Sequence, residues 1–337
     1  MAHRSLLTRA SVRFDRRWLV VIVVLGMVTA LATALHRRLL CAGLFLRLEG
    51  ATEPAFVVHY RERQVDVRSL SFAGGRGVLY VPRGERATTG VVLAHGMHED
   101  GIRDTRMVSF ARAIAGAGLA VLTPEVEGLA HYQITHDDVD RIAAAARALA
   151  AEIGQPRVAV LGISFGGGLA LRAACEPGTR GAIDRVIALG AHHDALRVSR
   201  FFLGEPARGP AGEQADVTPH PYSLKALFLS LFGETRKGPL RPEERERALV
   251  GLATRAEALA MASPSACPEP VRVPVHLVHG TGDRVVPFTE TLWNARHLAG
   301  QTEAKTLISP AIVHAEYAPP SLWDRAALVE FIVDALF

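Results

Sequence analysis

One short segment restricts what this 337-residue chain can fold into more than any other. It is the run Gly-Ile-Ser-Phe-Gly at residues 162–166, which has the form Gly-x-Ser-x-Gly. An apolar, β-branched run precedes it at 157–161, and residues 167–174 read as a helix. A strand, this motif and a helix are the context of a nucleophile elbow, a tight turn that exposes a serine hydroxyl. The motif alone also arises by chance, so its context favours Ser164 as a nucleophile over an ordinary turn serine.

Two later residues have the positions expected of partners for this serine. Asp283 lies in a glycine-rich loop directly after an apolar strand predicted at 274–280, and His314 follows a strand predicted at 303–309. A serine becomes a strong nucleophile when a histidine accepts its proton and an acid orients that histidine. Elbows of this kind occur with the chain order serine, acid, histidine. The sequence therefore predicts Ser164 as nucleophile, Asp283 as acid and His314 as base.

Each of these assignments has an alternative. Asp283 is also compatible with an ordinary turn-forming role, since aspartate is common in turns. Asp194, which follows an earlier predicted strand, is the alternative acid. His297 also follows Asp283, but it lies within a predicted helix, so His314 is the preferred base. Two further histidines either line the pocket or face solvent: His192 and His193.

With these residues the chain resembles the α/β-hydrolase superfamily, in its serine esterase, lipase and peptidase branch. The resemblance also rests on residues 93–97, Leu-Ala-His-Gly-Met, which read as a strand ending in His-Gly. It implies that the backbone N–H groups of Met97 and Phe165 form an oxyanion hole, with Asp283 as acid and His314 as base. The chain lacks a His-Gly-Gly-Gly string, which weakens a similarity to esterases of the hormone-sensitive-lipase type.

Strands and helices alternate along the chain, which predicts an α/β fold with a mostly parallel, doubly wound sheet. The resemblance covers about residues 56–337 and implies an α/β-hydrolase domain there, interrupted by one insertion. The segments 65–72 and 77–81 read as an antiparallel opening pair. The last segment, 322–336, has apolar residues at three- and four-residue steps and reads as an amphipathic helix.

The alternation breaks at about residues 195–267, where a helical cap insertion is expected. An apolar helix is predicted at 224–232 and a charged helix at 242–262. A cap of this kind excludes water and shapes the substrate site. Its apolar side chains either line an acyl pocket or form the core of the cap itself: Phe201, Phe202, Leu227, Phe228 and Phe232.

The N-terminal part predicts a membrane anchor. Residues 1–17 are basic, and residues 18–35 carry no charged side chain and would form a helix about 27 Å long, enough to span a bilayer. The stronger positive charge before this span favours a catalytic domain on the extracytoplasmic side. Residues 36–55 would form a linker. The alternatives are a signal peptide cleaved after Ala32-Thr33-Ala34, or a buried core helix.

Composition excludes several other classes. The net charge of +4 is small and comes largely from the N-terminal arginines, so the sequence predicts no nucleic-acid partner. Three cysteines cannot form a disulfide framework, and no cluster has metal-ligand spacing. We therefore expect no metal and no cofactor.

The expected function is that of a membrane-anchored serine hydrolase that cleaves a small-molecule ester or amide through an acyl-enzyme. A lipid bilayer would be its partner through residues 18–35. The same triad also cleaves peptides. Two other classes stay open: a membrane-linked acyltransferase, and an inactive α/β-hydrolase-fold binding protein.

Overall fold

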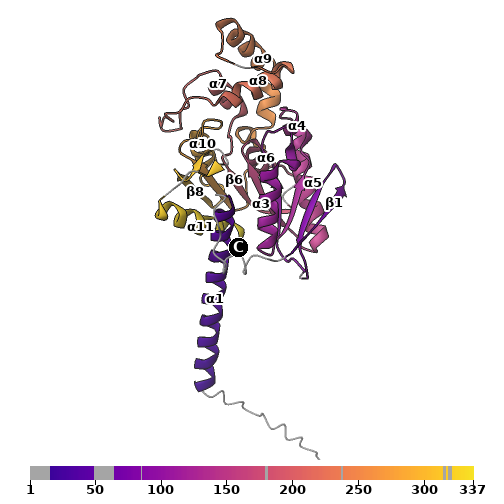
Figure 1. Cartoon of the computed structure of the whole chain (residues 1–337), viewed down its shortest axis with the longest axis vertical. Coiled ribbons are helices and arrows are strands. Elements are labelled where there is room, and N and C mark those ends of the chain that lie inside the picture. Colours follow the sequence, from indigo (N-terminus) through magenta and orange to yellow (C-terminus); the bar gives the residue numbers. More distant parts are fainter. Residues whose placement is uncertain are drawn as a thin grey trace, which may run out of the picture.

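The computed structural model describes residues 16–48, 64–84, 86–178, 181–236, 238–313, 316–317 and 321–337 (Figure 1). Eight strands form its main sheet: β1 (Val65–Phe72), β2 (Gly75–Pro82), β3 (Gly90–Ala94), β4 (Ala120–Pro124), β5 (Val158–Ile163), β6 (Ile183–Leu189), β7 (Val275–Gly280) and β8 (Ala304–Ser309). Two short strands, β9 (Ile312–Val313) and β10 (Glu316–Tyr317), pair with each other.

The strand order is β1-β2-β4-β3-β5-β6-β7-β8. β1 pairs with β2 and β2 with β4 in antiparallel fashion, and all later neighbours are parallel. The predicted mostly parallel sheet with an antiparallel opening pair is therefore confirmed. Because β3, β5, β6, β7 and β8 run in the same direction, the loops after them meet at one edge of the sheet.

Helices cover both faces of the sheet, as a doubly wound fold requires. Successive strand residues alternate between two apolar cores: Val92 and Val160 belong to one, Leu93 and Leu161 to the other. The first core is completed by α5 (His136–Ile153) and α6 (Phe165–Ala174), the second by α3 (Thr105–Gly116) and α11 (Leu322–Leu336). Strands buried on both faces carry continuous apolar runs, which explains how readily they are found in the sequence.

Helix boundaries follow local signals in the sequence. The first turn of α5 carries a capping box between Thr135 and Asp138, and Gly154 ends the helix in the left-handed conformation with φ of 68°. Shorter helices connect the main elements: η1 (Gly101–Arg103), α4 (Glu127–Ala130) and α10 (Thr289–Leu298).

The cap insertion lies between β6 and β7. It contains α7 (Ala195–Phe202), α8 (Pro221–Phe232), α9 (Pro242–Met261) and η2 (Pro264–Ala266), which lie at the top of Figure 1. The sequence predicts the helices of α8 and α9 within a few residues, whereas α7 is not among the predicted elements. The cap therefore projects from the edge of the sheet where the parallel strands end.

A disulfide joins the end of the cap to the sheet domain. Cys175, directly after α6, is bonded to Cys267, directly after η2, with their Cα atoms 5.7 Å apart. The bond closes a segment with a sequence separation of 92, which includes β6 and the whole cap. Closing a loop of this length stabilises a fold by roughly 4–5 kcal/mol in chain-entropy models. The cysteine count excluded a framework of several disulfides but did not predict this single bond.

The N-terminal helix differs from its predicted form. It is α1 (Arg16–Leu48), so residues 36–48, expected in a linker, are helical. The last part of α1 packs on α11, where Arg38 forms an ion pair with Glu330 and Arg37 donates a hydrogen bond to the carbonyl of Phe337 (3.3 Å). In the described part of the chain, no helix combines the length and apolar character needed to cross a bilayer. The predicted membrane-spanning helix at 18–35 is therefore not supported.

Candidate active site

Ser164 occupies a strained turn between β5 and α6. Its backbone has φ of 55° and ψ of −125°, and it is one of two described non-glycine residues with positive φ. Such a conformation costs of order 1–3 kcal/mol and persists where the surrounding structure enforces it. Here the Ser164 N–H donates to the carbonyl of Leu189 (2.7 Å) at the end of β6, and the Gly167 N–H donates to the Ser164 carbonyl (2.9 Å). The turn has the geometry of a nucleophile elbow.

The two motif glycines are required because backbone lies against them on both sides. A Cβ on Gly162 would be 2.3 Å from the carbonyl oxygen of Gly166. A Cβ on Gly166 would be 2.2 Å from the carbonyl oxygen of His95, at the end of β3. No side chain fits at either position without displacing backbone, so the motif spacing follows directly from the packing of this turn.

A cavity of about 380 Å³ opens beside Ser164. The elbow and the turn after β3 form one side of it, α3 a second side, and the cap the third. The lining is mainly apolar and includes Met97, Met107, Phe110, Ile163, Phe165, Leu189, Phe202, Tyr222, Ala226 and Val285. Ser164, Met97 and Phe165, all predicted from the sequence, thus share one cavity. The contribution of α3 was not predicted, because nothing in its pattern distinguishes residues that line a cavity from residues that pack in a core.

The turn after β3 is held from both sides. Val126 N–H donates to Nε2 of His95 (3.3 Å), so the proton of the neutral imidazole lies on Nδ1 and is donated to the carbonyl of Gly96 (2.7 Å). Burial lowers the pKa of His95, which favours this neutral form. On the other side, the hydroxyl of Tyr222 from α8 donates to the carbonyl of Met97. The carbonyl of Gly96 points toward the His95 ring. In a trans peptide the C=O and N–H groups point in opposite directions, so the N–H of Met97 points away from His95.

Asp283 is buried just beyond β7, with 1% of its surface exposed. Its Oδ1 accepts hydrogen bonds from the N–H groups of Val285 (2.8 Å) and Val286 (2.9 Å). Gly190, directly after β6, lies beside the other oxygen, because a Cβ on it would be 3.5 Å from Oδ2. The carboxylate is therefore fixed at the same sheet edge as the elbow, where β6 and β7 end.

Asp194, the alternative acid, caps a helix. Its Oδ1 accepts from the N–H groups of Leu196 (2.9 Å) and Arg197 (3.1 Å) in the first turn of α7. A capping aspartate of this kind stabilises a helix by about 1 kcal/mol. His314 lies outside the described residues, so its role as base stays a prediction.

The two adjacent histidines neither line this cavity nor face solvent. His192 is fully buried, and its ring centroid is 4.9 Å from that of Phe165. A Cβ on Gly168 would be 2.1 Å from the His192 ring, so this glycine lets the imidazole pack on α6. His193 is 7% exposed and stacks on Trp293. The His192 ring thus supports the elbow, whereas the His193 ring lies against α10.

Acid is expected to destabilise the fold through these histidines. Burial is the main cause that lowers the pKa of His192 to about 4 and that of His193 to about 3. In the unfolded chain a histidine titrates near about 6.5, so the unfolded state binds more protons below that pH. The stability is then complete above about pH 6.5 and falls as the pH drops, by about 1.4 kcal/mol per pH unit for each histidine. Urea unfolding measured from about pH 7.5 down to 4.5 gives this slope.

The variant His193→Gln is the control for this pH dependence. Glutamine does not titrate, so the stability of the variant should fall less steeply with acid, by about 1.4 kcal/mol per pH unit less than that of the wild type. Identical slopes in the variant and the wild type would contradict the assignment to His193.

The apolar side chains of the cap divide between two roles. Phe202 lines the cavity beside Ser164, and Phe201 lines a neighbouring cavity. Leu227 and Phe228 are buried in the large apolar core, and Phe232 packs against it. The acyl-pocket prediction thus agrees with the position of Phe202, and the core alternative describes the α8 residues. Among the described residues, no group of three or more His, Cys, Asp or Glu side chains could hold a metal ion.

Solved structures with a similar fold include hydrolases of several kinds. An acylaminoacyl peptidase in complex with Z-Gly-Gly-Phe-chloromethyl ketone matches with a TM-score of 0.55 and 16% identity over 83% of this chain. A puromycin hydrolase matches with a TM-score of 0.54 and 17% identity over 85% of this chain. The chain spans only 42% and 40% of these two proteins. A Pyrococcus furiosus esterase matches with a TM-score of 0.50 and 12% identity, covering 81% of this chain and 94% of the esterase.

Sequence comparison agrees with the fold. Curated proteins give no significant match. The family model described as alpha/beta hydrolase family matches residues 91–314, from β3 to the predicted base, which is well over half of the chain. The chain belongs to the alpha/beta hydrolase family.

Proposed function

We propose that this protein is a serine hydrolase that cleaves a carboxylic ester or amide through an acyl-enzyme. The observation that carries the proposal is the strained elbow at Ser164, which opens into a cavity of about 380 Å³ beside Met97 and Phe165. A structural serine would not need positive φ, two obligatory glycines and an adjacent cavity. Esterase and peptidase folds among the similar structures agree with this reaction class.

In the proposed reaction, the hydroxyl of Ser164 attacks the substrate carbonyl while His314 accepts its proton. Asp283 orients His314 and stabilises the imidazolium. The leaving group departs with a proton from His314. His314 then takes a proton from a water molecule that attacks the acyl-enzyme, and it returns this proton to Ser164 as the acid leaves. The paired ends of β7 and β8 support this arrangement, because Gly280 lies beside Ser309 and the loops that carry Asp283 and His314 start at one edge.

The oxyanion of each tetrahedral intermediate would be bound by the N–H groups of Met97 and Phe165. Each such donor contributes about 3–4 kcal/mol to transition-state stabilisation in other enzymes. The first donor is held in place by the bonds of His95 and Tyr222 described above. The second lies at the N-terminus of α6, where the helix dipole also favours a negative charge.

Hydrolysis of p-nitrophenyl esters and of matched anilides by the full chain tests this proposal. We expect release of p-nitrophenol from short esters, with slower cleavage of the amides. Product analysis with an added alcohol separates hydrolysis from acyl transfer, because an acyltransferase would form the new ester as its main product. The absence of turnover of every ester and amide would favour the binding-protein alternative.

An extracytoplasmic location stays a prediction, and we propose it on the basis of the disulfide. Bonds such as Cys175–Cys267 form and persist in oxidising compartments. Alkylation of the unfolded protein without reduction should therefore modify only Cys41, the one free cysteine. Modification of all three cysteines in protein isolated from its own cells would contradict this location.

A further inference from the structure

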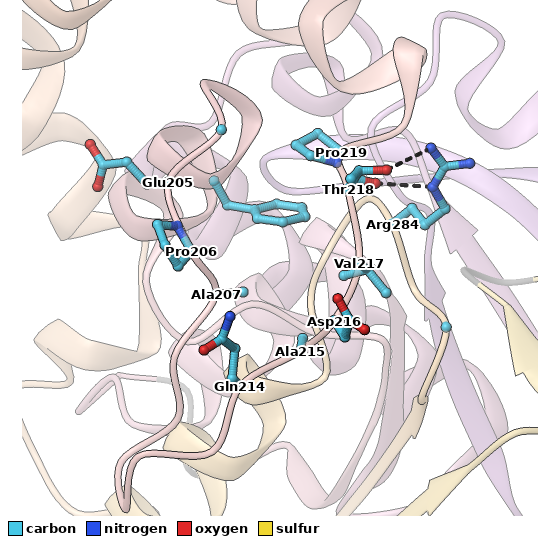
Figure 2. A pocket seen from close by; sticks show the side chains of 13 residues that line it. Glu205, Pro206, Ala207, Gln214, Ala215, Asp216, Val217, Thr218, Pro219 and Arg284 are labelled. Carbon is cyan, nitrogen blue, oxygen red and sulfur yellow. Dashed lines mark hydrogen bonds between the residues drawn. The ribbon is translucent and has the colours of Figure 1, made fainter.

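One charged residue, Arg284, lines both the active-site cavity and a second, neighbouring cavity. Figure 2 shows this second cavity, of about 490 Å³, between the loop that follows α7 and the segment that leads to α8. Arg284 lines both cavities and directly follows Asp283 in the chain. Its guanidinium lies at the rim of the second cavity, against Thr218 (Figure 2).

The charge of Arg284 is not neutralised by a carboxylate. Its Nε donates to the carbonyl of Thr218 (2.9 Å) and its Nη2 to the hydroxyl of the same residue (3.1 Å). Both acceptors are uncharged. No aspartate or glutamate side chain in the described part of the chain forms an ion pair with it. An arginine has five N–H donors, so most of them are free for a ligand.

The other charged residues of the active-site cavity cancel each other. Apart from histidines, its charged lining consists of Asp104, Arg106 and Arg284. Asp104 and Arg106 form an ion pair with Nη2 and Oδ2 2.7 Å apart. Histidines aside, Arg284 is therefore the one positively charged side chain in this lining that no described carboxylate pairs with.

The second cavity is lined by more acidic than basic side chains, which disfavours binding of an anion there. Glu205 and Asp216 both line it, against the single positive charge of Arg284. A negatively charged group is therefore favoured where Arg284 borders the cavity that it shares with Ser164. Arginine commonly binds a carboxylate with two parallel hydrogen bonds, a geometry that also fixes the orientation of the bound group.

We infer that the substrate carries a carboxylate, in its acyl part or its leaving group, and that Arg284 binds it. This inference rests on the proposed function and adds a substrate class to it: carboxylate-bearing esters or amides. A hydrogen bond to a charged partner contributes about 1.5–3 kcal/mol. We therefore expect a preference for the anionic substrate of about 10- to 100-fold in kcat/KM over a neutral one of the same length.

The test compares matched ester pairs with the full chain. One pair is p-nitrophenyl butyrate and mono-p-nitrophenyl glutarate, which differ by a carboxylate on the acyl part. The other is phenyl butyrate and 4-carboxyphenyl butyrate, which differ in the leaving group. We expect the wild type to prefer the anionic member of at least one pair, and Arg284→Gln to bring that ratio to about one. Arg284→Lys should keep part of the preference, because it keeps the charge but not the fork of donors.

A matched control removes another arginine charge from the cap. Arg200 is exposed on α7 and lines neither cavity, so Arg200→Gln should keep the ratio and the rates of the wild type. A purely structural role of Arg284 at Thr218 would lower the rates of both members equally and leave the ratio unchanged. That result, or a wild type that prefers the neutral member of both pairs, overturns the inference. Turnover of the neutral esters reports on Ser164, so failure of the carboxylate site is distinguishable from failure of the proposed function.

Discussion

Replacement of Ser164 by alanine should abolish ester hydrolysis and leave the fold intact. The hydroxyl oxygen forms the covalent bond in the proposed reaction, and no other group at the elbow can take its place. Loss of a nucleophile of this kind lowers kcat by about 10⁴–10⁶. The rate of p-nitrophenol release from a short ester, together with a thermal unfolding curve, measures both parts of the expectation.

A stability measurement and a control variant separate loss of the nucleophile from loss of the fold. The backbone of Ser164 already has positive φ, and alanine suffers the same strain there, so the melting temperature should change by only a few degrees. Ser71→Ala, at an exposed position of β1, is the matched control and should keep full activity. A Ser164→Ala protein that is folded and still active would reject Ser164 as the nucleophile.

The second large effect is expected for Asp283→Asn. An asparagine still accepts hydrogen bonds from the N–H groups of Val285 and Val286, so the loop after β7 should keep its conformation. It does not stabilise an imidazolium, and it favours the wrong tautomer of the histidine. In a well-studied triad this exchange lowers kcat by about 10⁴. We expect a loss of about 10³–10⁴ in kcat, measured with the same ester.

The parallel variant Asp194→Asn separates the two candidate acids. Asparagine is as good a helix cap as aspartate, so α7 should begin as before and the activity should stay within about twofold of the wild type. Loss of activity in Asp194→Asn, with Asp283→Asn still active, would assign the acid to Asp194 instead.

Most of the fold could be predicted from the sequence, because the signals are local. The strands buried on both faces are continuous apolar runs, and α5 begins at a capping box between Thr135 and Asp138. The elbow could also be predicted from its two glycines. Backbone atoms lie where the Cβ of any other residue would be at Gly162 and Gly166, so only glycine fits at these positions. α1 shows the limit of such reasoning. Its apolar run predicts a membrane span, but no described helix has the length and apolar character that a span needs. Residues 36–48, expected as a linker, continue the helix instead and bring Arg37 and Arg38 against α11.

The parts of the site that the sequence did not predict depend on contacts between distant segments. Tyr222 reaches the carbonyl of Met97 from the cap, across a sequence separation of 125. In the sequence nothing distinguishes Arg284 from other loop residues, and only the structure shows that it lines two cavities. His192 was expected at a pocket or a surface, and only the packing of its ring on Phe165 explains its burial. No periodicity or spacing encodes these contacts.

The site of covalent modification by a fluorophosphonate probe tests the central claim most directly. The probe reacts with a serine only where a base activates it and an oxyanion site stabilises the adduct. Tryptic peptide mapping of the labelled full chain should find the adduct on Ser164 and nowhere else, and Asp283→Asn should slow its formation strongly. A folded wild-type protein that stays unlabelled, or that carries the adduct on another residue, would contradict the assignment of this elbow as the catalytic centre.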